Sequence, residues 1–415
     1  MAQVFPFRPY RYAPPAGAPE NLLTQPYDKI SLAMRARYLS LSPHNLVRAV
    51  LGERRAEDSA QDNVYTRAAR HLEQWIDGGV LVQEAEPSFY AYFQEFVDPD
   101  SGQRLTRKGF IGLGELEPYS AGVVHRHEQT LTGPKQDRME LLQYTRAQFE
   151  LLFLLYPDAE GAIDRVLDAA AEAAPEVALT DEYGAGHRLW RIARPGAVAQ
   201  IQRLMADKKL IIADGHHRYE TALTFRDAHP ELTAARRAPF TFVNMHSPGL
   251  RILATHRLVS DIEGFDAAAL LGRLRSRFRV ETFASGAALK TVFGERRQER
   301  IRVGVALAGS PEVYLVECGR GAGQLDVTFL HQTILDGMLG IDEAAVREQR
   351  YLRYIRGIDA ALEAVAQPPA QAAFLLESTT IEQVAEVSFS GGVMPQKSTD
   401  FYPKLLSGLT IYRFE

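Results

Sequence analysis

The residues best suited to chemistry lie between Lys209 and Leu223, in the sequence KLIIADGHHRYETAL. The apolar run predicts a strand, Asp214 and Gly215 predict a tight turn, and the residues after them predict a helix. The first amide groups of a helix have no partner within it, and the helix dipole adds partial positive charge there. Because Gly215 leaves room for an anion to approach the backbone, we expect this turn to bind phosphate or another anion.

Three consecutive polar residues after this glycine strengthen the prediction. His216, His217 and Arg218 point in different directions on a helix, so one buried face cannot hide all of them. The planar guanidinium of Arg218 suits phosphate or carboxylate oxygens. The alternative is an ordinary capped turn without a ligand, because Asp-Gly before a helix is also typical of that structure.

A second dense polar segment, VHRHEQTLTGPKQDR, precedes the middle of the chain. It places His127 beside Glu128, with Thr130 and Arg138 nearby. A histidine next to a carboxylate can move a proton or bind a metal ion. The alternative is a solvated, charged loop that leads into a helix starting at Pro134.

The donors in these two segments could in principle form a metal site, since they include His125, His127, His216, His217 and Asp214. Zinc needs three or four converging ligands, and the His-Glu-x-x-His spacing is absent. The sequence therefore favours magnesium held mainly through phosphates, with Asp214 or Glu128 as the protein ligand.

A third polar segment lies near the end of the chain, in GGVMPQKSTDFYPKLL. Lys397 and Ser398 follow a glycine pair and a proline, and lysine with a hydroxyl suits phosphate binding. The glycine spacing of a Walker loop is absent, so a plain polar loop is the alternative.

Alternating strand and helix patterns surround these segments and predict an α/β fold of the mixed α+β kind. A hairpin is expected at 88–97 and 103–113, and further strands at 187–192, 210–213, 240–246, 250–258, 301–307 and 313–317. Helices are expected at 31–39, 62–76, 134–150, 162–173, 198–206, 216–226, 267–277, 328–338 and 358–366. We expect three regions, which can be interleaved: 1–150 with the hairpin, 151–260 with the glycine turn, and 261–415 with the third polar segment.

Composition narrows the function further. The 415 residues carry a net charge of −5, which is poor for a dedicated nucleic-acid binder. Cys318 is the single cysteine, so no internal disulfide can form and a reducing compartment is expected. No secretory leader and no run of about 18 apolar residues is present, so we expect a cytoplasmic protein without a membrane partner.

Several motifs together resemble the Domain of Unknown Function 1015 family. They are PFxxY from Pro6, PYDKI at 26–30, HEQT at 127–130, GPKQDR at 133–138, IADGHHRYETAL at 212–223, THRL at 255–258 and MPQKST at 394–399. The Asp-Gly-His-His-Arg element is also similar to the phosphate-contacting signature of the superfamily that contains ParB, sulfiredoxin and the free serine kinases. This resemblance implies a ParB/sulfiredoxin-like mixed-sheet core elaborated by further α/β segments, and a nucleotide whose phosphates lie against residues 214–218.

The leading hypothesis is a phosphotransferase that uses ATP or ADP with magnesium to phosphorylate a small hydroxyl metabolite, such as serine or a related amino acid. Phosphoryl transfer asks a protein mainly for positioning and positive charge. Glu128, Asp214 and His217 are the candidate catalytic residues, and Glu128 is assigned as the base by analogy with the separate carboxylate of serine kinases. The candidate phosphate ligands are Gly215, His216, His217, Arg218, Lys397 and Ser398. The alternatives are a nucleotide-binding regulatory protein without turnover and a metal-dependent hydrolase.

Overall fold

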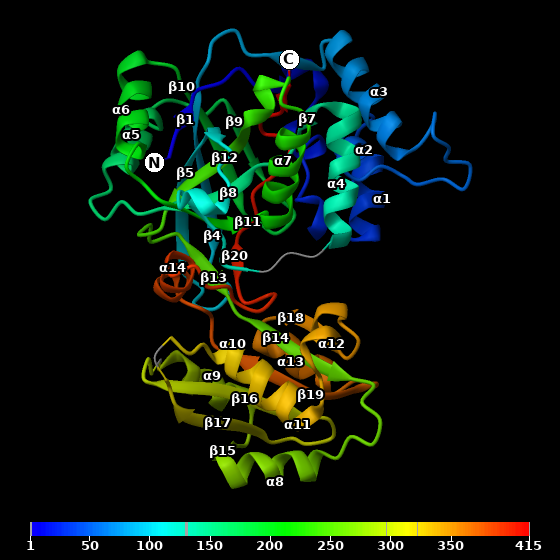
Figure 1. The fold of residues 1–415 in the computed structure, drawn as a ribbon, viewed down its shortest axis with the longest axis vertical. Coiled ribbons are helices and arrows are strands. Elements are labelled where there is room, and N and C mark those ends of the chain that lie inside the picture. Colours follow the sequence, from blue (N-terminus) through cyan, green and yellow to red (C-terminus); the bar gives the residue numbers. More distant parts are fainter. Residues whose placement is uncertain (1, 129–131, 296, 322, 415) are drawn as a thin grey trace.

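The chain folds into two bodies, each built on one main β-sheet, and Figure 1 shows them one above the other. This is a computed structural model, and it describes residues 2–128, 132–295, 297–321 and 323–414. We call the two parts the large-sheet body and the small-sheet body. Most of the motifs that bear chemistry lie where the two bodies face each other.

The large-sheet body is organised around a nine-stranded sheet in the order β6-β11-β8-β12-β5-β4-β10-β9, with β1 also paired to β5. Two pairs, β8 with β12 and β6 with β11, are parallel, and the others are antiparallel. The expected mixed α/β architecture is therefore confirmed. The strands are β1 (Val4–Phe5), β4 (Phe89–Val97), β5 (Arg104–Glu115), β6 (Val124–His125), β8 (Leu152–Tyr156), β9 (Val177–Thr180), β10 (Gly186–Ile192), β11 (Leu210–Asp214) and β12 (Arg237–Asn244).

Helices cover both faces of this sheet, as Figure 1 shows. One group contains α7, which packs against α4, and α4 in turn packs against α3. The other group is α5 and α6, which lie on the opposite side. The helices are α1 (Leu32–Leu41), α2 (Val47–Val50), α3 (Val64–Asp77), α4 (Thr132–Thr145), α5 (Ala162–Ala170), α6 (Pro195–Met205) and α7 (His216–Ala228).

The small-sheet body holds a six-stranded antiparallel sheet in the order β15-β17-β16-β19-β14-β18. Its strands are β14 (Thr255–Ser260), β15 (Arg279–Phe283), β16 (Arg300–Leu307), β17 (Val313–Gly319), β18 (Leu352–Arg356) and β19 (Ala370–Leu376). Its helices are α8 (Ala267–Arg277), α9 (Gly286–Gly294), α10 (Asp326–Phe329), a π-helix (Leu330–Asp336), α11 (Gly337–Leu339), α12 (Glu343–Glu348) and α13 (Ile358–Val365).

The end of the chain returns from the small-sheet body to the large-sheet body. After α14 (Ile381–Phe389), β20 (Asp400–Tyr402) pairs with β13 (Arg251–Leu253), and both lie between the two bodies in Figure 1. β21 (Tyr412–Arg413) then pairs with β7 (Ala147–Gln148), which belongs to the large-sheet body. Another short sheet joins β2 (Tyr10–Tyr12) to β3 (Leu81–Gln83).

Two expected elements need correction. The helix expected through residue 150 ends at Thr145, because Arg146 adopts a left-handed conformation with φ 48° and β7 follows directly. The single strand expected at 250–258 is two strands in different sheets, β13 and β14, which are separated at Ala254. The hairpin of β4 and β5 is confirmed. Among the described residues, no helix has the length and apolar character needed to span a membrane.

Candidate functional site

A cavity of about 550 Å³ lies between the two bodies. The large-sheet body contributes side chains from the 25–29 turn, Glu128, the 181–183 turn and the 213–218 segment. The small-sheet body contributes Thr255, Gln349, Tyr354 and Arg356, and residues between 396 and 404 complete the wall. This volume is within the range of small-molecule sites.

The glycine turn opens α7 directly onto this cavity. Gly215 has φ 95°, and no side chain caps the helix, so the opening amides face the cavity with the positive end of the helix dipole. A side chain at this position would bring its Cβ within 2.8 Å of a Leu152 methyl and 3.0 Å of the Arg218 guanidinium. Both the backbone conformation and the close packing therefore require glycine here.

Asp214 lies at the mouth of this turn as the counterion of two cations. Its carboxylate is 3.6 Å from Nζ of Lys404 and 3.7 Å from the guanidinium of Arg218. Burial alone would raise the pKa of Asp214, but Lys404, Arg218 and Lys29 together hold it well below the ordinary value. Asp214 therefore remains charged at neutral pH, where it is a poor proton acceptor.

Basic side chains surround this carboxylate. Lys404 also lies 3.1 Å from Asp400, whose carboxylate accepts a hydrogen bond of 2.7 Å from Nε of Arg356. Burial tends to lower the pKa of Lys404, yet Asp214 and Asp400 raise it above the ordinary value. Lys29 lies on the same cavity, where burial and the charge of Lys404 lower its pKa. The cavity wall at this end therefore carries several cations, which lie close to the carboxylates of Asp214 and Asp400.

Glu128 joins the second and third polar segments of the sequence. The Lys397 amide donates a 3.2 Å hydrogen bond to its Oε1, and Glu128 forms an isolated parallel bridge with Met394. The Met394 amide also donates to the His127 carbonyl at 2.7 Å. Burial raises the pKa of the Glu128 carboxyl, and the charge of Lys397 counters this only in part.

The buried histidine pair consists of His216, on the cavity wall, and His127, behind it. Nδ1–H of His127 donates to the Ile212 carbonyl at 2.8 Å, which leaves Nε2 to accept from the Thr399 hydroxyl at 2.8 Å. The His216 ring lies 4.6 Å from the His127 ring, and its Nε2 accepts from the His127 amide at 3.5 Å. Burial lowers the pKa of His127 to about 4 and that of His216 well below its ordinary value. Both rings are therefore neutral at pH 7.

The cavity brings most of the predicted site residues together but not all of them. His127 does not line the cavity, but its ring is hydrogen-bonded to Thr399, which does. The Ser398 hydroxyl donates away from the cavity, to the Pro395 carbonyl. Arg138 lies elsewhere, with its guanidinium 4.0 Å from the centre of the Tyr27 ring. Thr130 lies outside the described residues. The predicted residues on the cavity wall are Glu128, Asp214, Gly215, His216, His217, Arg218 and Lys397.

Several cavity residues were not among the predicted site residues. Asp28 and Lys29 belong to the PYDKI motif, which the sequence analysis used for the family resemblance without assigning it a role. Lys404 lies within the third polar segment of the sequence, although it was not among the predicted phosphate ligands. Arg356 ends β18, and no pattern around it indicates a site. The motif could have identified the first two residues, whereas Arg356 depends on tertiary structure.

The described residues do not form a metal cage of their own. No group of three or more histidine, cysteine, aspartate or glutamate residues that could hold a metal ion occurs in this part of the chain. His125, one of the potential ligands, packs its ring against Phe389 and lies 3.2 Å from the Gly122 carbonyl.

Comparisons with known proteins agree with the sequence motifs. A family model described as "Protein of unknown function (DUF1015)" matches residues 4–330. The comparison with curated proteins found no match.

Three solved structures are also similar to this chain. A free serine kinase in complex with AMP is 14% identical, with a TM-score of 0.38, and the match covers 72% of this chain and 91% of that chain. A free serine kinase mutant in complex with ADP has the same identity and coverage, with a TM-score of 0.37. SbnI from Staphylococcus aureus, with a C-terminal truncation, is 10% identical, with a TM-score of 0.35 and coverage of 72% and 87%. At TM-scores this low, the function must be argued from the residues of this chain itself.

Proposed function

The chain belongs to the DUF1015 family, and from the residues of its cavity we propose that it binds the phosphates of a nucleotide and transfers a phosphoryl group to a small hydroxyl compound. One observation carries the proposal: the uncapped start of α7 and the side chains of Arg218, Lys404 and Lys29 converge on one cavity. The finer assignments, ATP or ADP as donor and serine or a related amino acid as acceptor, are part of this proposal.

The positive end of the cavity supplies what phosphoryl transfer demands. In the transition state, negative charge spreads over the phosphoryl oxygens, and fixed donors and cations stabilise it. The opening amides of α7 would bind these oxygens, and Arg218 and Lys404 would neutralise them. Residues 214–218 would thereby act as the phosphate-contacting element that they resemble in the ParB and sulfiredoxin superfamily.

Glu128 is the proposed base. It lies on the wall of the same cavity, and burial raises its pKa toward neutrality, which suits a carboxylate that must accept a proton. Glu128 takes the hydroxyl proton of the acceptor while the acceptor oxygen bonds to the terminal phosphorus. The bridging P–O bond breaks, and its electron pair leaves with the shortened nucleotide. His217, on the first turn of α7, would donate to the transferred group.

Two remaining assignments follow from the proposed nucleotide. A magnesium ion would arrive on its phosphates, with Glu128 or Asp214 as the protein ligand, and would add positive charge at the transferring group. None of the roles assigned above to the side chains depends on that ion. We also propose that this activity takes place in the cytoplasm, where ATP and ADP are available.

The proposal is tested with purified protein and labelled nucleotide. We expect ATP or ADP to bind in isothermal titration calorimetry and a label on the terminal phosphate to move to a hydroxyl amino acid in a panel of candidate acceptors. Glu128→Gln is expected to bind the nucleotide and to transfer nothing. Nucleotide binding without any labelled product from a broad metabolite pool would instead support a regulatory nucleotide-binding protein, and absence of binding would overturn the proposal.

A further inference from the structure

A segment near the end of the chain runs from one body to the other along the cavity. We call residues 394–406 the strap, because they follow α14 and enter the large-sheet body at the level of β20. It carries Lys397, Thr399, Asp400 and Lys404 to the cavity wall. The position of these side chains therefore depends on what holds the backbone of the strap.

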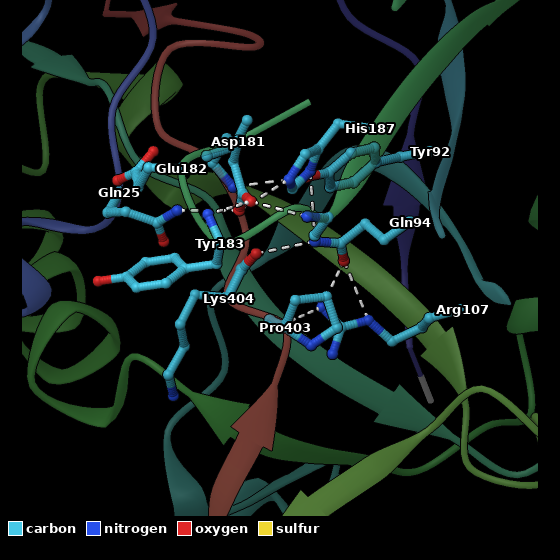
Figure 2. Close-up of polar contacts among 12 residues, drawn as sticks. Gln25, Tyr92, Gln94, Arg107, Asp181, Glu182, Tyr183, His187, Pro403 and Lys404 are labelled. Carbon is cyan, nitrogen blue, oxygen red and sulfur yellow. Dashed lines mark hydrogen bonds and ion pairs between the residues drawn. The ribbon is translucent and has the colours of Figure 1, made fainter. Parts of the chain in front are cut away.

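Arg107, on β5, holds the end of the strap that reaches the large-sheet body. Its guanidinium is fully buried and donates to the carbonyls of Tyr402, at 3.2 Å, and Pro403. Its Nε donates at 3.0 Å to Oε1 of Gln94, whose Nε2 donates at 2.8 Å to the Lys404 carbonyl. The carbonyls of Tyr402, Pro403 and Lys404 therefore all accept hydrogen bonds from buried side chains of the large-sheet body. Figure 2 shows the Lys404 side chain extending away from this network.

The same network continues to another residue of the cavity wall, Asp181. The Tyr92 hydroxyl accepts from the Leu406 amide at 3.4 Å and lies 2.7 Å from Nδ1 of His187. Nε2 of His187 lies 3.2 Å from Asp181, a residue of the cavity wall (Figure 2). The strap end is therefore part of one continuous buried polar network.

Arg257, on β14, holds the other end of the strap from the small-sheet body. It is also fully buried, and one of its terminal nitrogens donates to the carbonyls of Gln396 and Lys397, both at 3.1 Å. Its Nε donates to the neutral His331 ring at 3.2 Å. Each body thus contributes one buried arginine that binds carbonyls of the strap.

These two arginines share an unusual feature. Among the described residues, no carboxylate forms an ion pair with either of them. Burying an unpaired cation is costly unless its donors are well used, and only arginine offers five donors in a fixed planar fork. Burial lowers the pKa of both guanidinium groups to about 10, so both still carry their charge at neutral pH.

We propose that Arg107 and Arg257 are positioning residues, which fix the strap from its two ends and so hold Lys404 and Lys397 in place for anion binding. The inference rests on the proposed function for its ligand, a phosphate-bearing molecule. The fixed strap itself can be tested without any ligand. Because the strap is already fixed, anion binding does not include the free-energy cost of ordering this segment.

The test compares Arg107→Lys and Arg257→Lys with Arg302→Lys as the matched control. Arg302 is equally buried, and its hydrogen bonds go to the carbonyls of Val292 and Glu295 and to Glu377, all outside the strap. Lysine keeps the charge but loses the planar fork, so a defect in the first two variants reports geometry rather than charge.

Two measurements decide the outcome. Amide hydrogen exchange of the peptide covering residues 394–406 is expected to quicken in Arg107→Lys and Arg257→Lys and to stay at the wild-type rate in Arg302→Lys. Calorimetric titration with inorganic pyrophosphate is expected to give about tenfold weaker binding in the first two variants, because reordering one backbone residue costs about that factor. Should Arg107→Lys fail to fold, Gln94→Met takes its place, because it removes both the Lys404 carbonyl contact and the acceptor of Arg107 Nε. Should Arg257→Lys fail to fold, His331→Phe takes its place, because it removes the acceptor of Arg257 Nε.

Wild-type exchange rates in the strap of all variants would overturn the proposal. Equal loss of pyrophosphate affinity in Arg302→Lys would overturn it as well, since the effect would then be general. If the wild type binds neither pyrophosphate nor ADP, the proposed function fails, while the exchange rates still decide whether the two arginines fix the strap.

Discussion

Lys404→Met is the substitution that probes the cavity most sharply. Methionine keeps an unbranched apolar side chain that is one atom shorter and removes the ammonium group with its charge and donors. Lys404 is the cation shared by Asp214, at 3.6 Å, and Asp400, at 3.1 Å, and its side chain is only 10% exposed. Removal of the charge should therefore affect both the binding of anions and the stability of the fold.

The expected size follows from the geometry. Two unit charges about 4 Å apart attract each other by about 4 kcal/mol at an effective dielectric constant near 20. If about half of this is offset by the desolvation of a phosphate, about 2 kcal/mol remains, which corresponds to roughly 30-fold weaker binding. Removal of one partner from a buried ion pair also costs about 3 kcal/mol of folding stability.

The pH dependence has a definite sign. The folded-state pKa of Asp214 is held down largely by Lys404, so the stability from this pairing is present above the ordinary carboxyl pKa and is lost as the pH falls below it. The difference in stability between the wild type and Lys404→Met should therefore shrink under acidic conditions. Urea unfolding at several pH values measures this difference.

The assay is calorimetric titration of ADP or pyrophosphate into the wild type, Lys404→Met and Lys209→Met. Lys209 is an exposed lysine outside the cavity wall, so its variant controls for the general loss of one positive charge. Equal affinity in all three proteins would refute the reasoning, because the cation nearest to Asp214 would then play no part in anion binding.

Three further predictions test individual residues. Glu128→Gln should lower transfer about a thousandfold with little change in nucleotide affinity, and wild-type turnover should fall as the pH drops through the raised pKa of Glu128, which a pH–rate profile measures. His127 must be neutral in the fold, so the free energy of unfolding should fall by about 3 kcal/mol as the pH drops from 6.5 to about 4. In His127→Gln that slope should flatten in urea titrations, and an unchanged slope would contradict the assignment. Gly215→Ala should destabilise the protein by about 1–3 kcal/mol and weaken pyrophosphate binding, and a melting temperature equal to that of the wild type would contradict the requirement for glycine.

Local sequence patterns were enough to predict the centre of the candidate site. The strand, glycine turn and helix at 210–228 follow from an apolar run and an Asp-Gly pair, because these signals act within a few residues. The β4–β5 hairpin follows from alternating residues around its turn for the same reason. The start of α7 is therefore the part of the cavity that needed no knowledge of tertiary structure.

The rest of the cavity depends on contacts between distant segments. Glu128 meets Lys397 across 269 residues of sequence, and Arg107 binds the carbonyl of Tyr402 across 295 residues. A buried arginine within a strand gives no local indication of which carbonyls it will bind. The split of 250–258 into two strands likewise reflects the separation of the two sheets rather than any breaker residue at Ala254.

The crystal structure of the protein with bound ADP tests the central claim most directly. The account predicts phosphate oxygens within hydrogen-bond distance of the opening amides of α7, with Nζ of Lys404 and the Arg218 guanidinium as their nearest cations. ADP bound with its phosphates away from the start of α7, or bound outside the cavity, would contradict it.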